Sequence, residues 1–151
     1  MDTGRRRALS SSAALAAAAF FGVSGRSFAT VEEVQQAIAE FGGGIEATQG
    51  ALKLTMPEVA ENGHSVPLSV MVDSPMTEND YVESIMILAE NNPYARIATF
   101  HFTPASGVAK VSARMRLAET QNVVAVARLS DGSLLKDTKS IRVVIGGCGH
   151  Q

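Results

Sequence analysis

Apolar and polar residues alternate along most of this chain with the two-residue period of β-strands. Residues 109–117 are the clearest case, because Val111 and Met115 fall on one side of the extended chain and Ser112 and Arg114 on the other. Seven stretches that alternate in this way, or are continuously apolar, are predicted as strands: 51–56, 66–72, 81–89, 95–102, 109–117, 121–129 and 139–145. Short strands separated by turn residues favour a mostly β fold, an antiparallel β-sandwich of the immunoglobulin type.

One stretch has the period of an α-helix instead. Apolar residues lie three and four positions apart in residues 30–41, and the three glycines at 42–44 follow. Thr30 and Glu33 have the spacing of a capping box, in which each side chain bonds the other residue's backbone N–H. The sequence therefore predicts a short helix before the first strand.

The first 29 residues have the features of an export signal. Three consecutive arginines at 5–7 precede an apolar, alanine-rich stretch at 13–23, and small residues stand at Ser27 and Ala29. The apolar stretch is short for a membrane span, and consecutive arginines indicate the twin-arginine route, which carries folded proteins. We expect cleavage after Ala29 and a mature chain in the periplasm that begins at Thr30.

The mature chain has the size of one domain and an acidic balance. Removing 29 of the 151 residues leaves 122, with nine basic and fourteen acidic residues and a formal net charge of −5. This charge argues against nucleic acid or an anionic membrane as a partner. We expect one domain of helix plus β-sandwich at 30–145, without an internal disulfide because the chain has a single cysteine.

That cysteine lies in a glycine-rich C-terminal segment, residues 146–151, here called the arm. Its sequence is Gly146-Gly147-Cys148-Gly149-His150-Gln151. Glycines leave the backbone free and let a partner approach the sulfur closely, so we predict a flexible arm that projects a reactive thiol. A protonated His150 would favour the thiolate and the chain-terminal carboxylate would oppose it, which makes His150 a possible modulator of the thiol.

Other roles for the cysteine are less favoured by the residues around it. A glycine-flanked chain end has nothing in which to bury an inert cysteine, and the residues after Cys148 lack the aliphatic character of a prenylation signal. A copper-binding tip made of Cys148 and His150, or a disulfide anchor to a partner, stays open. His64 and His101 are interpreted as surface or structural histidines, with no reason in the sequence to meet the arm.

Several segments together resemble the SoxY family of sulfur carriers in bacterial thiosulfate oxidation. Besides the arm and the export signal, they are Glu61-Asn62-Gly63, Val66-Pro67-Leu68, Asp73-Ser74-Pro75-Met76, Phe102-Thr103-Pro104 and Arg116-Leu117. The family ends in Gly-Gly-Cys-Gly-Gly, whereas here His150 replaces the last glycine and Gln151 follows. The resemblance covers essentially the whole mature chain.

The resemblance implies a covalent carrier rather than an enzyme, with no cofactor or metal of its own. Cys148 would hold the sulfur intermediates, and Gly146, Gly147 and Gly149 would form its flexible mount. The implied partners are a small β-sandwich subunit, SoxZ, in a heterodimer; the c-type cytochrome SoxAX; the manganese-dependent hydrolase SoxB; and the molybdenum sulfane dehydrogenase SoxCD. The alternative is a periplasmic binding protein whose Cys148 and His150 tip binds copper or tethers a partner.

Overall fold

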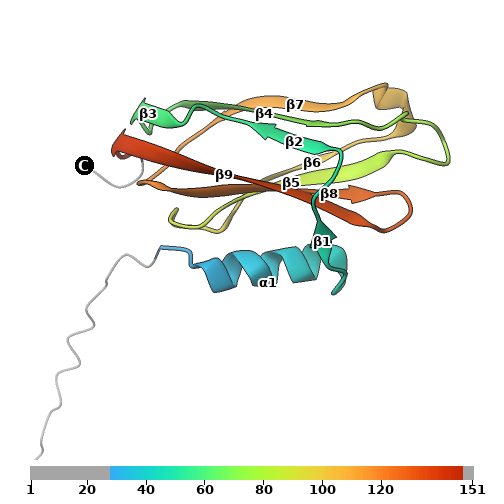
Figure 1. Cartoon of the computed structure of the whole chain (residues 1–151), viewed down its shortest axis with the longest axis horizontal. Helices are drawn as coiled ribbons and strands as arrows, with labels where there is room; N and C mark the ends of the chain where they lie inside the picture. Colours follow the sequence, from blue (N-terminus) through green and yellow to red (C-terminus); the bar gives the residue numbers. More distant parts are fainter. Residues whose placement is uncertain (1–27, 148–151) are drawn as a thin grey trace, which may run out of the picture.

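Two β-sheets and one α-helix form three layers in residues 28–147, the part of the chain that the computed structural model describes (Figure 1). The elements are α1 (Val31–Gly42), β1 (Ala47–Thr48), β2 (Leu52–Thr55), β3 (Val59–Asn62), β4 (Val66–Val72), β5 (Val82–Ala89), β6 (Arg96–His101), the 3-10 helix η1 (Pro104–Ser106), β7 (Ala109–Met115), β8 (Gln121–Leu129) and β9 (Leu134–Ile145). This arrangement confirms the predicted mostly β sandwich with a short N-terminal helix.

Strand β9 pairs with three other strands of the larger sheet. That sheet has the order β1-β9-β8-β5-β6, with β3 also paired to β9, and the smaller sheet has the order β2-β4-β7. Pairing is antiparallel except where the short strands β1 and β3 run parallel to β9. The last residue of β9, Ile145, pairs with Asn62 of β3, whereas the pairing of β9 with β8 ends at Ile141.

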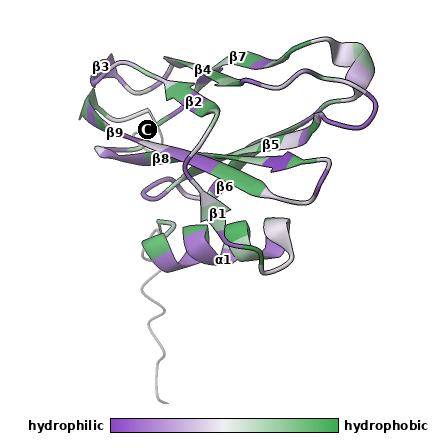
Figure 2. Ribbon diagram, turned by 45° about the vertical axis from the view of Figure 1, so that its right-hand side comes forward, coloured by the Kyte–Doolittle hydropathy of each residue, from purple (hydrophilic) through white to green (hydrophobic). Residues whose placement is uncertain are grey.

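The main core lies between the two sheets. Leu54, Val70, Ile85, Leu117 and Ile141 are among its fully buried residues and come from both sheets and the loop after β7. Alternation explains the pattern: β4 has its even-numbered residues in the core and Pro67, Ser69 and Met71 facing outward. Figure 2 shows hydrophobic and hydrophilic residues interspersed along these strands.

A second, smaller core joins α1 to the outer face of the larger sheet. Val34 and Ile38 of the helix pack with Met86, Leu88 and Val126 of the sheet. The predicted capping box is present, because Glu33 N–H donates to Thr30 Oγ1 at 3.2 Å and Thr30 N–H donates to Glu33 Oε2 at 3.0 Å. The helix therefore packs on the sandwich itself.

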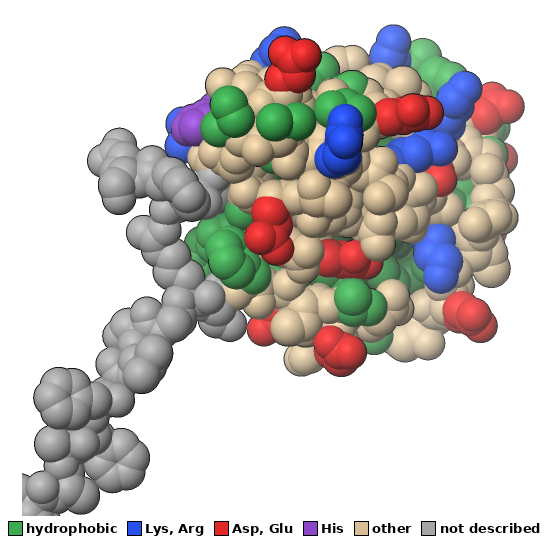
Figure 3. Space-filling model, turned by 60° about the vertical axis from the view of Figure 1, so that its left-hand side comes forward, with side chains coloured by type: hydrophobic (Ala, Val, Ile, Leu, Met, Phe, Trp, Pro, Cys, Tyr) green, Lys and Arg blue, Asp and Glu red, His purple; other side chains and the backbone are tan. Residues whose placement is uncertain are grey.

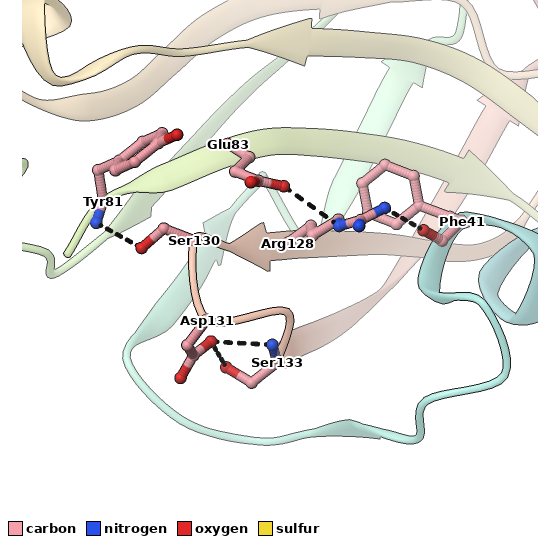
Figure 4. A network of polar contacts seen from close by, with 7 residues as sticks. All are labelled: Phe41, Tyr81, Glu83, Arg128, Ser130, Asp131 and Ser133. Carbon is pink, nitrogen blue, oxygen red and sulfur yellow. Dashed lines mark hydrogen bonds and ion pairs between the residues drawn. The ribbon is translucent and has the colours of Figure 1, made fainter. Parts of the chain in front are cut away.

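Arg128 connects the helix and two strands from the edge of this second core (Figure 4). Its guanidinium donates to the carbonyl of Phe41 at 3.5 Å and forms an ion pair with Glu83 at 3.2 Å. In the neighbouring β8–β9 turn, the hydroxyl and the amide of Ser133 both donate to Asp131, and these bonds lower the pKa of the Asp131 carboxyl.

The predicted strands differ from the structure mainly where pairing depends on distant residues. Strands 66–72 and 121–129 are confirmed at both ends. The sequence prediction missed β1 and β3, and it began the last strand at Lys139 rather than Leu134. Glu61 and Asn62 belong to β3, and the turn begins at Gly63.

Candidate functional site

The chain leaves the sandwich at the end of β9, beside the β3–β4 turn (Figure 1). Residues 63–65 of that turn and residues 116–120 between β7 and β8 meet there. We call the backbone contact formed by Gly63, Leu117, Ala118, Gly146 and Gly147 the glycine junction. It is the last described part of the chain before Cys148.

Three consecutive backbone hydrogen bonds hold the glycine junction together. Gly63 N–H donates to the carbonyl of Ile145 at 2.7 Å, and Leu117 N–H donates to the carbonyl of Gly63 at 2.8 Å. Gly147 N–H then donates to the carbonyl of Leu117 at 2.7 Å. The bonds connect β9, the β3–β4 turn, the loop after β7 and the start of the arm into one unit.

The junction has no space for side chains at its three glycines. A Cβ on Gly63 would collide with the carbonyl oxygen of Leu117 and would lie 2.8 Å from the nitrogen of Gly147. A Cβ on Gly147 would collide with the carbonyl of Gly63, and one on Gly146 with the carbonyl oxygen of Ala118. None of the three has a positive φ, so close backbone approach, rather than backbone conformation, requires glycine here.

A buried amide supports the loop on which the junction rests. Asn92, only 4% exposed, donates from Nδ2 to the carbonyl of Arg116 at 2.8 Å. Its Oδ1 accepts from the N–H of Ala118 at 2.9 Å and from Nε2 of Gln121 at 3.0 Å. These bonds hold both sides of Leu117, the residue that bonds Gly63 and Gly147.

The surface around the junction is partly apolar. Val144 and Ile145, the two residues before the arm, are 62% and 61% exposed, and Val59 on β3 is 42% exposed. His64 is exposed and its Nδ1 lies 2.8 Å from Oδ1 of Asn62. Figure 3 turns this side of the molecule toward the viewer and shows apolar, acidic and basic side chains mixed, without a large area of one charge.

The structure corrects one expectation about these residues. Gly146 and Gly147 were predicted to be part of a free segment, but Gly147 is buried and both approach backbone atoms of other loops. His64 is exposed, in agreement with the prediction of a surface histidine, although its backbone nitrogen lies near Gly147. The reason is the register of β3 on β9, which no local pattern reveals. Cys148, Gly149 and His150 lie outside the described residues.

Reasoning from the sequence missed Gly63 and Asn92. Nothing in the local sequence distinguishes Asn62-Gly63 or Asn91-Asn92-Pro93 from ordinary turn residues. The one available signal was that a glycine stands at both positions that meet, 63 and 147. The presence of two glycines does not show that they are in contact. Contacts between residues 63, 117 and 147 are visible only in three dimensions.

No group of three or more His, Cys, Asp and Glu side chains that could hold a metal occurs in residues 28–147. A hollow of about 610 Å³ on the outer face of the smaller sheet is lined by Thr55, Ser69, Ser112, Arg114 and apolar residues, with no histidine, cysteine or carboxylate. Within the same range, no helix is long and apolar enough to cross a membrane.

Comparison with known proteins places the chain in a family. A family model described as sulfur oxidation protein SoxY matches residues 38–148. The chain belongs to the SoxY family. The solved structure of the sulfur carrier protein SoxY from Chlorobium limicola f thiosulfatophilum is 30% identical, with a TM-score of 0.65, and the match covers 77% of this chain and 100% of that one. The resemblance to SoxY seen in the sequence is thereby confirmed.

More distant matches show the fold alone. A superoxide reductase (neelaredoxin) from Ignicoccus hospitalis has a TM-score of 0.56 at 17% identity, covering 77% of this chain and 94% of that one. A putative superoxide reductase from Thermotoga maritima has a TM-score of 0.53 at 17% identity, covering 65% and 87%. No curated protein matches the chain. SoxY proteins thus share their sandwich with proteins of another function.

Proposed function

We propose that this SoxY family member is a sulfur carrier that holds sulfur intermediates covalently on Cys148 and presents them to partner enzymes. The observation that carries the proposal is the range of the family match, which runs through the whole sandwich and ends at Cys148. Gly147, the residue immediately before Cys148, is buried and bonded to Leu117 in the glycine junction, so the chain is tied to the sandwich up to the residue before the cysteine.

Attachment of thiosulfate to the thiol is an oxidation. The Cys148 thiolate and the outer sulfur of thiosulfate form an S–S bond, giving the Cys–S–S–SO₃⁻ adduct and releasing two electrons to a c-type cytochrome. Water then cleaves the bond between the sulfane sulfur and the sulfonate, leaving a persulfide, Cys–S–S⁻, with sulfate and two protons. Further oxidation of the persulfide sulfur needs another electron acceptor.

A carrier can leave each of these steps to its partners. An ordinary cysteine thiol is mostly protonated at neutral pH, and only the thiolate is nucleophilic. Each receiving enzyme can supply the base, metal or positive field in its own cleft. The proposed partners are SoxAX for attachment, SoxB for hydrolysis and SoxCD for oxidation of the sulfane sulfur, with a SoxZ-like subunit completing a heterodimer.

We further propose that the protein works in the periplasm after cleavage of residues 1–29. Support comes from the arginines at 5–7, the apolar stretch and the small residues before Thr30. Ala29 is buried and its N–H donates to the carbonyl of Asn92 at 2.7 Å, so cleavage after Ala29 would remove this contact. The measured mass of the mature chain tests the site directly.

The test of the carrier function is mass spectrometry of the protein from cells grown on thiosulfate. We expect a mature chain that begins at Thr30 and a C-terminal peptide with sulfane or thiosulfonate adducts that a reductant removes. The Cys148→Ser variant, expressed in the same cells, should have no adduct. The proposal is wrong if the Cys148 peptide stays unmodified throughout growth on thiosulfate and cells with Cys148→Ser grow like the wild type.

A further inference from the structure

We propose that the side of the sandwich between β6 and β7, here called the open side, binds an extended acidic segment of another protein as an added strand on β7. Both sheets end at this side, because β6 is the last strand of the larger sheet and β7 the last strand of the smaller one (Figure 1). An added strand hydrogen-bonds the free backbone groups of an edge strand. The proposal does not depend on sulfur chemistry at Cys148.

Every second residue of β7 directs its backbone N–H and C=O away from the smaller sheet. Leu54 of β2 lies opposite Val70 of β4, but its N–H donates to the carboxylate of Asp137 and not to β4. The backbone groups of Val70 therefore bond β7, through its register partner Val111. The residues of β7 that alternate with Val111 direct their backbone groups outward: Lys110, Ser112 and Arg114.

The opposite side of the sandwich is covered by the chain itself. The outward N–H of Leu54 on β2 is bonded to Oδ2 of Asp137 at 2.8 Å. In the larger sheet, β1 and β3 both pair with β9. Proteins commonly cover or block their sheet edges, and the hydrogen bonds within residues 28–147 leave the outward amides of β7 without a partner. The edge of β7 is therefore available to another chain.

A hollow of about 490 Å³ lies between the two edge strands. It is lined on one side by Phe100, His101 and Phe102 and on the other by Lys110, Val111 and Ser112. Phe100 and Phe102 are half-buried against the main core, so the parts of their rings left exposed form an apolar wall. A segment paired with β7 would direct alternate side chains toward this wall.

The charge of the open side favours an acidic segment. Residues 91–118, which contain β6 and β7, have four lysines and arginines and no aspartate or glutamate, although the mature chain has a net charge of −5. Lys110 and Arg114 are exposed on β7, and Arg114 Nε donates to Ser65 Oγ at 2.7 Å, which holds its guanidinium beside the strand. Arg96 on β6 already has Glu40 as an ion-pair partner, at 3.9 Å. Acidic side chains on an added strand would lie next to Lys110 and Arg114.

A second copy of this chain is a poorer occupant of the same edge. Two β7 strands paired edge to edge would bring Lys110 and Arg114 of both copies onto one surface, and like charges on neighbouring strands are destabilising. Lysine on an edge strand is a common means of preventing such pairing. The charges that exclude a second copy attract an acidic segment.

Peptide binding to the full mature chain, followed by NMR hydrogen exchange, tests the proposal. The probe is a peptide of alternating glutamate and valine with the seven-residue length of β7. A peptide of alternating lysine and valine controls for charge, and an acidic peptide N-methylated at every residue controls for backbone hydrogen bonding. The test variant is Lys110→Glu. Lys53→Glu, at an exposed position of β2, is the matched control.

We expect the acidic peptide to slow exchange at the amides of Lys110, Ser112 and Arg114. Exchange at Leu54, whose amide already has a partner, should not change. Lys110→Glu should weaken binding about fivefold, because one attractive charge pair becomes repulsive. Lys53→Glu should bind like the wild type, and both control peptides should bind more weakly than the acidic peptide.

Three results would overturn the proposal. The first is unchanged exchange at Lys110, Ser112 and Arg114 in excess acidic peptide. The second is equal binding of the acidic and the lysine-containing peptides. The third is protection of the same amides without peptide in a concentration-dependent dimer, which would make a second copy the occupant. None of these measurements involves Cys148, so their failure is distinguishable from failure of the carrier function in the adduct test.

Discussion

Asn92 is the residue on which the end of the sandwich depends most. It is almost fully buried, donates one hydrogen bond and accepts two, all of them to the loop that carries Leu117 or to Gln121. Every buried side-chain nitrogen and oxygen in residues 28–147 has a partner. The amide group has its donor and its acceptor on separate atoms, so Nδ2 and Oδ1 can bond different parts of the loop at once.

Replacing Asn92 should therefore destabilise the fold and loosen the glycine junction. Asn92→Ala leaves the N–H of Ala118 without its acceptor and the carbonyl of Arg116 without its donor, and the free energy of unfolding should fall by about 2–3 kcal/mol. Urea denaturation measures this loss. Asn79→Ala, at an exposed position in the turn before β5, is the control and should change stability by less than about 0.5 kcal/mol. If Asn92→Ala is as stable as the wild type, the loop at Leu117 does not depend on the Asn92 side chain and the prediction is wrong.

Helix α1 is an integral layer of the domain. Its buried residues Val34 and Ile38 fit onto apolar residues of the larger sheet, and Arg128 bonds the carbonyl of Phe41 near its end. Burial of an apolar helix face is the main source of helix stability in proteins of this size. The helix therefore needs no partner subunit to cover its apolar side.

Ile38→Ala tests whether the helix is packed in the isolated chain. Removing a buried isoleucine side chain should lower the free energy of unfolding by about 2–4 kcal/mol. Gln35→Ala, on the exposed side of the same helix, should have little effect. Because Ile38 belongs to the helix–sheet core rather than the glycine junction, hydrogen exchange at the Gly147 amide should be as in the wild type. An unchanged stability of Ile38→Ala would indicate that the helix packs elsewhere in solution.

Local pattern predicted the elements that have one face in the core and one in water. Strand β4 alternates cleanly because it lies in the middle of a three-stranded sheet whose outer face is exposed. Strands β1 and β3 were not predicted because each is short and is defined by parallel pairing to β9, far along the chain. The start of β9 was missed because Lys136 and Asp137 interrupt its apolar character.

The site was predictable only in part, for the same reason. A lone cysteine among glycines and the family resemblance both point to the arm from sequence alone. A glycine can serve either a flexible segment or a close backbone contact, however, and the sequence does not distinguish the two. The position of Gly63 opposite Gly147 shows the close contact. That contact depends on the parallel register of β3 with β9, which has no local signature in the sequence.

The whole molecule combines a sandwich, whose fold superoxide reductases share, with a glycine-rich arm that contains the single cysteine. The match to superoxide reductases at 17% identity shows a shared fold and does not indicate a shared chemistry. Protein metal sites commonly need three or four side-chain ligands, and residues 28–147 offer no group of three. Cys148 and His150 together would provide two.

We therefore expect the purified full mature chain to retain no stoichiometric iron or copper. The measurement is elemental analysis after gel filtration, on protein first incubated with excess iron(II) or copper and without chelators. His150→Gly should give the same result as the wild type, since two ligands on one short segment hold a metal weakly. One copper per chain that survives gel filtration and is lost in Cys148→Ser would restore the copper-binding tip. One iron per chain kept by both variants would instead indicate a metal site within the sandwich and would contradict this prediction.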